Sequence, residues 1–177
     1  MPAPHRPRPR QRPRHASPLR RTGLCLLLTA AAAACAAAGV IDRDDTVAAP
    51  QLPAYVQDCA ACHMAYPPGL LPATSWQHLM ANLPRHFGTD ASLDPRTLKV
   101  LSEWLVANAG SFRRVVRDPV QPPQDRISQS TWFVQKHREI DARVWRRPAI
   151  GSAARCDACH SAAEQGQFSE HDVYMPK

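Results

Sequence analysis

Cys59-Ala60-Ala61-Cys62-His63 recurs in pattern as Cys156-Asp157-Ala158-Cys159-His160, and these two stretches decide how the chain folds. Each has two cysteines separated by two residues and followed at once by a histidine, a pattern typical of covalent haem attachment. Two thiols one helical turn apart can reach the two vinyl groups on one edge of the porphyrin. The next residue then brings an imidazole to the iron as its proximal ligand. The sequence therefore predicts two covalently bound haem c groups.

Two other interpretations use the same four cysteines. Paired C-x-x-C units also bind structural zinc, but the spacers Ala-Ala and Asp-Ala lack the glycine or basic residues of a zinc knuckle. Two C-x-x-C disulfides, structural or thioredoxin-like, are a further alternative, although the sequence has no βαβ pattern. The remaining cysteines, Cys25 and Cys35, lie in the N-terminal segment, so none is left for a structural disulfide elsewhere. Haem attachment is the interpretation we prefer.

Each iron also needs a sixth ligand, or an open position if it is to bind gas or peroxide. Outside the N-terminal segment and the two motifs, the candidate histidines are His78, His86, His137 and His171. His86 lies at a break in the chain beside an aromatic residue and a glycine, which suits close approach to a flat cofactor. His137 lies in a short amphipathic helix, whereas His78 is expected to face solvent and His171 lies in a polar tail. We expect His86 and His137 to be the distal ligands.

Methionine is the other common sixth ligand of c-type haem, and it would raise the reduction potential. The candidates are Met64, Met80 and Met175. Met64 follows His63 directly, so it cannot reach the opposite face of the same haem and is expected to pack against the porphyrin. The residues alone leave open which distal histidine serves which haem.

The charge distribution indicates export and argues against nucleic-acid binding. The formal net charge is +7, but seven of the 22 basic residues lie in the first 21 positions, which leaves 15 basic against 15 acidic residues. A basic groove for a phosphate backbone is therefore not supported. The basic start, the apolar run from Thr22 to Ala38 and the small residues at its end predict a cleaved signal peptide. An uncleaved membrane anchor and a lipoprotein site at Cys35 are the alternatives.

Capping residues indicate where the helices begin. The expected N-caps are Asp94, either Thr74 or Ser75, and either Ser128 or Ser130. After Asp94, Pro95 suits the first helical position, and an apolar stripe continues to a stop at Gly110. Strand signals are scarce throughout. The predicted fold class is mainly α, a small haem-packed c-type cytochrome with short helices, long loops and two haem-binding halves.

The predicted organisation follows the two motifs. Its parts are a signal peptide (1–38), a linker (39–50), a first haem-binding half (51–117), an extended Pro-rich connector (118–127) and a second haem-binding half (128–177). About 139 residues remain after export, too few for a large conventional core. The haems are expected to supply much of the missing apolar surface.

With these residues in view, the chain resembles the dihaem cytochrome c family, often called DHC, from about Tyr55 to the C-terminus. The resemblance rests on residues 59–72, Ser75-Trp76, His86-Phe87-Gly88, the helix ending in Ala107-Asn108-Ala109, residues 136–140, the second motif and residues 163–168. It implies a small periplasmic protein with two bis-histidine haems, His63 and His86 on the first iron and His160 and His137 on the second. It also implies partners: an oxygen-binding c-type cytochrome called SHP and a membrane cytochrome b.

The expected function is electron transfer between a membrane or soluble donor and a haem-protein acceptor, without catalysis, small-molecule substrate or nucleic acid. Bis-imidazole ligation is expected to give both haems fairly low reduction potentials. One alternative is a dihaem peroxidase-like or oxygen-reducing enzyme with one displaceable ligand. It would have too few distal ligands and an acid–base pocket. Another is a haem-based sensor, which would need an output domain.

Overall fold

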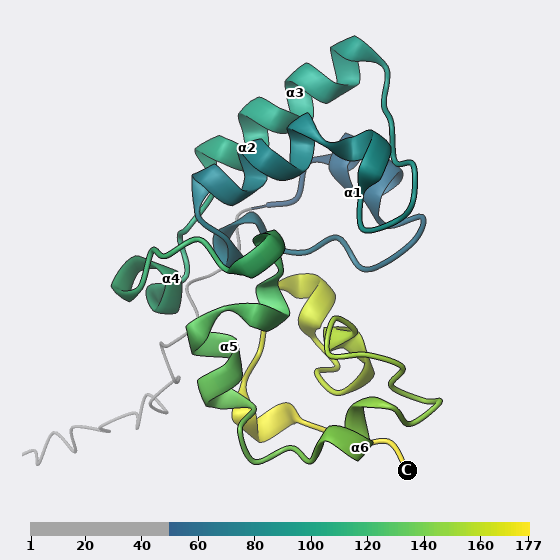
Figure 1. The fold of residues 1–177 in the computed structure, drawn as a ribbon, viewed down its shortest axis with the longest axis vertical. Helices are drawn as coiled ribbons and strands as arrows, with labels where there is room; N and C mark the ends of the chain where they lie inside the picture. The colour runs from purple at the N-terminus through teal and green to yellow at the C-terminus, as the bar shows by residue number, and fades with distance from the viewer. Residues whose placement is uncertain (1–49) are drawn as a thin grey trace, which may run out of the picture. The chain divides into compact units, whose positions relative to one another are not determined.

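The computed structural model describes residues 50–177, which form short helices joined by long loops (Figure 1). The α-helices in this range are α1 (Pro53–Cys59), α2 (Ala73–Ala81), α3 (Pro95–Ala107), α4 (Arg113–Arg117), α5 (Thr131–Lys136) and α6 (Ala142–Trp145). The 3-10 turns are η1 (Pro68–Leu70), η2 (Leu83–Arg85), η3 (Pro123–Asp125), η4 (Ile127–Gln129), η5 (Cys156–Ala158), η6 (Ala163–Gln165) and η7 (Glu170–Asp172). Within 50–177, extended pairing is limited to two isolated bridges, so the mainly α fold class is confirmed.

The predicted signal peptide and nearly all of the predicted linker lie outside the described residues, so both stay predictions. In the part of the chain from residue 50 onward, no helix has the length and apolar character to cross a bilayer.

Helix α3 follows the sequence prediction at its start. The Asp94 carboxylate accepts hydrogen bonds from the backbone amides of Arg96 at 3.0 Å and Thr97 at 3.1 Å. These bonds satisfy two of the amides that a helix start leaves without intrahelical partners. Leu101 and Leu105 from the apolar stripe are fully buried. The stripe therefore faces the core.

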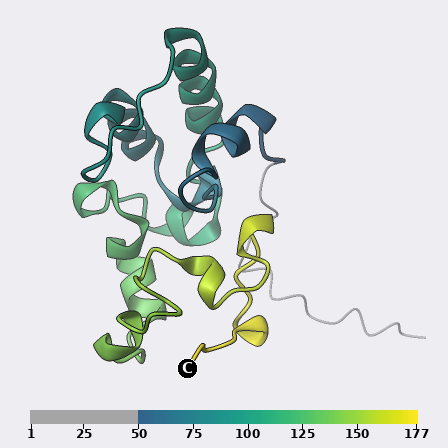
Figure 2. The same cartoon turned by 90° about the vertical axis from the view of Figure 1, so that its right-hand side faces the viewer.

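The main apolar core lies in the first half, where α2 packs on α3 (Figures 1 and 2). Its buried members are Tyr55, Ala65, Leu71, Trp76, Met80, Leu83, Leu101 and Leu105. Two buried polar side chains of this core are paired, since Tyr55 donates to the Tyr66 carbonyl and Trp76 Nε1 donates to the Pro68 carbonyl, both at 2.8 Å. Trp104 packs against this core with its ring 5.1 Å from that of Tyr55.

The second half has less apolar core of its own. A small cluster of Leu70, Phe112 and Val115 receives Trp132 and Phe168 from the second half. Tyr66 also bridges the halves, since its hydroxyl donates to the Ala154 carbonyl at 2.7 Å. The second half therefore depends on contacts with the first half and on whatever fills its cavity.

Two predicted helix boundaries are wrong. Helix α2 has Pro72 as its N-cap, with no side-chain cap from Thr74 or Ser75. Ser75 lies inside the helix and is fully buried, because the helix must turn this face toward the core. Helix α3 ends at Ala107 with Asn108 as its C-cap, and Gly110 lies beyond it with φ +62° and donates its amide to the Leu71 carbonyl.

The Pro-rich connector is extended only in its first part. Residues 118–122 have no helical structure, as expected, but η3 and η4 follow directly. Gln124 and Asp125 have positive φ values of 54° and 56°, which close a tight turn. The predicted cap at Ser130 is confirmed, because its hydroxyl accepts from the Phe133 amide at the start of α5.

Replacing Asp94 with Ala is expected to lower the free energy of unfolding of the holoprotein by about 1 kcal/mol, because two amides lose their cap. Asp94→Asn is the matched control, since an amide oxygen also caps, and it should stay within a few tenths of a kcal/mol of the wild type. Chemical denaturation followed by far-UV circular dichroism measures both. Equal losses in the two variants would contradict the capping role.

Candidate haem sites

The first motif opens on a cavity of about 630 Å³. Cys59 ends α1, and the next residues turn so that Cys59, Cys62 and His63 all line this cavity. His86, which follows η2, lines it from another segment. The ring centroids of His63 and His86 lie 6.1 Å apart, with 30° between the ring planes. The structure thus brings the first motif together with His86.

The two rings of this first pair are held differently. His63 Nδ1 is hydrogen-bonded to the Met64 carbonyl at 2.7 Å, which leaves its Nε2 available to a metal. His86 belongs to a tight turn in which the Thr89 amide donates to the His86 carbonyl at 3.0 Å. Burial lowers the pKa of His86, with smaller contributions from His63 and Arg126. A lowered pKa favours the neutral imidazole, which is the form that binds metals.

The second motif opens on a cavity of about 710 Å³. It begins with η5, where the amides of Cys159 and His160 both donate to the Cys156 carbonyl. Cys156, Cys159, His160 and His137 line the cavity. The ring centroids of His137 and His160 lie 6.3 Å apart, with 81° between the ring planes. The second motif is therefore paired with His137.

His137 is fixed by the helix that carries it. It caps the C-terminus of α5, and its Nδ1 is hydrogen-bonded to the Phe133 carbonyl at 2.8 Å. Its ring stacks on Phe133, with centroids 3.9 Å apart. Burial also lowers its pKa against the opposing effect of the hydrogen bond to Phe133, and the charges of Arg114 and Lys136 lower it further.

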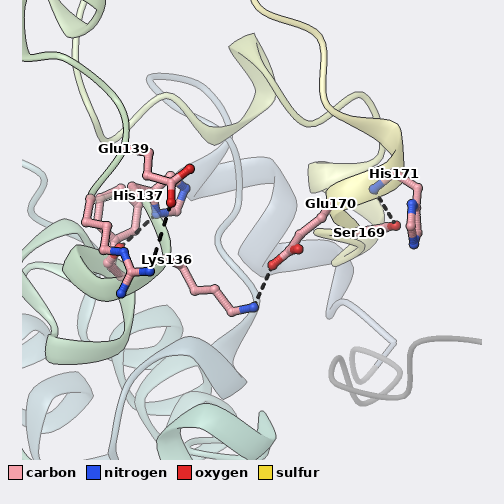
Figure 3. Close-up of polar contacts among 8 residues, drawn as sticks. Lys136, His137, Glu139, Ser169, Glu170 and His171 are labelled. Carbon is pink, nitrogen blue, oxygen red and sulfur yellow. Dashed lines mark hydrogen bonds and ion pairs between the residues drawn. The ribbon is translucent and has the colours of Figure 1, made fainter.

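Helix α5 is also tied to the C-terminal segment. Figure 3 shows Lys136, the neighbour of His137, donating to Glu170 at 2.5 Å. His171 lies beyond Glu170 in the same view, well away from His137, and its amide donates to Ser169. Glu170 lines the second cavity and His171 does not, and the ion pair with Lys136 ties this segment to the side of the cavity that α5 forms.

The spacing of both pairs fits two axial ligands of one metal. With metal–nitrogen bonds of about 2 Å and roughly 1.1 Å from each nitrogen to its ring centre, two imidazoles on opposite sides of a metal have centroids about 6.3 Å apart. The observed distances are 6.1 Å and 6.3 Å. Both cavities also fall in the size range of small-molecule and cofactor sites. The residues present therefore fit two haem groups, each attached through one motif.

The cysteines do not suit the zinc or redox alternatives. No group of three or more His, Cys, Asp or Glu side chains within residues 50–177 is arranged to hold a metal ion, whereas structural zinc needs four ligands. None of the four motif cysteines is joined to another in a disulfide. Burial raises the pKa of Cys59 and of Cys156 to about 11, with nearby Asp58 and Asp157 contributing. Redox-active C-x-x-C motifs need a lowered thiol pKa instead.

The other ligand candidates lie in less suitable places. The His78 side chain is 61% exposed and its Nδ1 is 2.8 Å from Gln121 Nε2, so the solvent-facing prediction is confirmed. Met64 is buried and does not line the first cavity, and its packing against a porphyrin stays a prediction. Met80 and Met175 do line the first and second cavities respectively. Neither displaces a histidine from the facing pairs.

Several aromatic residues near the sites had no local sequence signal. The Tyr66 ring lies 4.9 Å from His63, and the Phe168 ring lies 5.6 Å from His160. The Trp145 ring lies 5.8 Å from His137. Each ring lies three to eight residues along the chain from its histidine, across irregular backbone to which neither helical nor strand periodicity applies.

The two cavities share part of their walls. Ile127, Ala153, Arg155 and Cys156 line both of them. A cysteine of the second motif therefore also borders the first cavity. Groups held in the two cavities would be separated by little more than this shared wall.

The comparisons with known proteins agree with this geometry. A sequence profile described as dihaem cytochrome c, DHC, matches residues 55–168. A dihaem cytochrome type c from Shewanella baltica OS155 is 40% identical, with a TM-score of 0.61, covering 72% of this chain and 95% of its own. A dihaem cytochrome c from Rhodobacter sphaeroides is 45% identical, with a TM-score of 0.60, covering 67% of this chain and 97% of its own. Among curated proteins the comparison finds no match.

The two ring-plane angles predict different electron paramagnetic resonance signals from the two ferric haems. Near-parallel imidazoles separate the energies of two iron d orbitals, which gives a rhombic signal, whereas near-perpendicular ones leave them almost equal and give one very large g value. The first pair, at 30°, should give the rhombic signal and the second, at 81°, the anisotropic one. Frozen ferric protein provides the measurement. Loss of the rhombic signal, instead of the anisotropic one, in His137→Ala would contradict this assignment.

Replacing all four motif cysteines with Ala is expected to abolish cooperative thermal unfolding, because two cavities of 710 Å³ and 630 Å³ lose their covalently held occupants. Helicity by circular dichroism and the sharpness of the melt are the measurements. Variants that lose only one cysteine pair are the controls and should keep one haem per chain. Native helicity and a sharp transition in the four-cysteine variant would show that the haems are not part of the core.

Proposed function

The chain belongs to the dihaem cytochrome c family and carries two covalently bound haem c groups, and from this we propose that it is a periplasmic electron carrier with bis-histidine ligation at both irons. Dihaem cytochromes c are electron carriers. The finer assignment identifies His63 and His86 as ligands of the first iron, and His160 and His137 as ligands of the second. Cys59, Cys62, Cys156 and Cys159 are the attachment residues.

The observation that supports this proposal is that each motif histidine faces a second histidine at axial-ligand spacing. When bound, the haems supply reversible one-electron storage at iron. Two strong axial ligands would leave little geometry to change between oxidation states. Bis-imidazole ligation without a thioether would also give low reduction potentials.

The residues of the chain position the two sites and connect them. The Met64 and Phe133 carbonyls orient the His63 and His137 rings, so that Nε2 of each faces its cavity. The shared wall of Ile127, Ala153, Arg155 and Cys156 supports short-range transfer between the haems. Outer-sphere transfer then needs only a partner that approaches one haem edge.

The proposed location and partners rest on the sequence. The basic and apolar N-terminal segment supports export to the periplasm, and c-type cytochromes of this kind are typically exported. The proposed partners are an oxygen-binding c-type cytochrome (SHP) and a membrane cytochrome b. Resemblance to the family is their support.

Replacing His86 or His137 with Ala should convert one haem of the two, and only one, from low spin to high spin. The reason is that each variant removes one axial ligand from one iron. Absorption spectra of the ferric and ferrous proteins, with covalent haem counted per chain, provide the measurement. His78→Ala is the control, because this exposed histidine faces no motif and both haems should stay low spin. Two low-spin haems in His86→Ala and His137→Ala would refute the ligand assignment.

Carbon monoxide separates the carrier from the enzyme alternative in the same samples. The reduced wild-type protein should show no change within the mixing time, since both axial positions are filled and carbon monoxide must first displace a histidine. The two variants should react at once, each at one haem. A prompt change in the wild type would reveal an iron open at rest and would favour a peroxidase-like or oxygen-reducing enzyme.

A further inference from the structure

We propose that the first haem site can bind a diatomic ligand in place of His86, while His137 holds its position at the second haem. This inference rests on the proposed bis-histidine ligation. In the exchange, the bond from iron to His86 breaks, a bond from iron to the diatomic forms, and the oxidation state of the iron is unchanged. The chain would thus contain one exchangeable and one fixed haem site.

The two distal histidines differ first in their hydrogen bonding. His137 Nδ1 is bonded to the Phe133 carbonyl at 2.8 Å, whereas His86 Nδ1 is buried and has no hydrogen-bond partner among the described residues. A bond at the second nitrogen fixes the ring orientation and makes the imidazole a stronger ligand. Loss of such a bond typically lowers metal affinity by about 10- to 100-fold. His86 is therefore the weaker ligand.

The two rings also differ in their packing. The His137 ring stacks on buried Phe133, with centroids 3.9 Å apart and 19° between planes. The His86 ring meets its neighbour Phe87 edge-on at 4.8 Å, and Phe87 is 45% exposed. Rotation of His137 away from its metal would break a stacked buried contact. Rotation of His86 would not.

The backbone that carries His86 is strained as well. Phe87 and Gly88 have φ values of 51° and 94°, so residues 86–89 form a turn with both central residues in the left-handed region. Such turns favour Gly, Asn or Asp at these positions, and a bulky residue there is costly. His137 instead ends a regular helix. Release of His86 would let its turn relax, which lowers the cost of exchange at the first haem only.

The charges around His86 do not select for an anion over a neutral ligand. The Arg126 guanidinium lies over the Phe87 ring at 4.1 Å, but Asp90 and Asp125 line the same cavity. Size is the stronger constraint, because the displaced imidazole stays attached to a short turn beside the iron. The ligand class is therefore diatomic, and cyanide is the probe for the ferric protein.

The test compares two variants of the holoprotein, each with one haem already open. In His137→Ala the second haem binds cyanide freely, so the remaining cyanide-binding step reports His86 at the first haem. In His86→Ala the remaining step reports His137. Bound cyanide is counted per chain by infrared absorption during titration. Binding of this second cyanide, at the haem that still has both histidines, is expected at a cyanide concentration at least about 10-fold lower in His137→Ala than in His86→Ala.

The outcomes separate this inference from the proposed function. If the second cyanide binds at equal concentrations in the two variants, or at a lower concentration in His86→Ala, the inference is overturned and the ligand assignment stays intact. If neither variant binds cyanide more readily than the wild type, the ligand assignment itself fails.

A third variant tests the packing argument. Phe133→Leu removes the ring stacked on His137 but keeps the backbone carbonyl. It should lower the cyanide concentration at which His137 is displaced from the second haem. Val134→Ala, at a 57% exposed position on the same helix, is the matched control and should leave it unchanged. If Phe133→Leu leaves the cyanide concentration needed at the second haem unchanged, stacking does not hold His137.

Discussion

Two facing pairs of imidazoles are the constraint on which the rest of this structure depends. Each pair joins segments that the backbone leaves apart: His63 after α1 meets His86 after η2, and His137 at the end of α5 meets His160 after η5. A metal between two rings requires both segments to hold their spacing to within a fraction of an ångström. Four short elements serve this purpose, since α1, η2, α5 and η5 each end within a few residues of one of the four histidines.

The two halves meet this constraint by different means. The first half has a core of its own, in which α2 and α3 bury Leu101, Leu105 and Trp76 behind the cavity. His86, which lines its cavity, is carried by a turn whose two central residues have positive φ. The second half has little core, but His137 is fixed by a helix end, a carbonyl and a stacked ring. The first half thus has the firmer scaffold and the less constrained histidine, and the second half has the reverse. The two sites are therefore physically unequal within one small chain.

The sequence predicted what local chemistry determines. The helical class, the Asp94 and Ser130 caps, the solvent-facing His78 and the burial of the Leu101–Leu105 stripe all follow from side chains acting on their immediate neighbours. The caps proposed at Thr74 or Ser75 failed because packing of α2 against α3 turned Ser75 inward, which no local pattern records. The pairing of His63 with His86 was left open by the residues and implied only by family resemblance. Contacts such as Tyr66 to Ala154 span 88 residues and had no signal at all.

The shared wall between the cavities explains why the halves cannot be treated as independent haem modules. Cys156, a residue of the second motif, borders the first cavity, and the Tyr66 hydroxyl from the first half bonds the chain just before it. Any movement of the second motif would therefore change the packing around both sites. Conversely, a ligand that displaced His86 would occupy a cavity that Cys156 of the second motif helps to line.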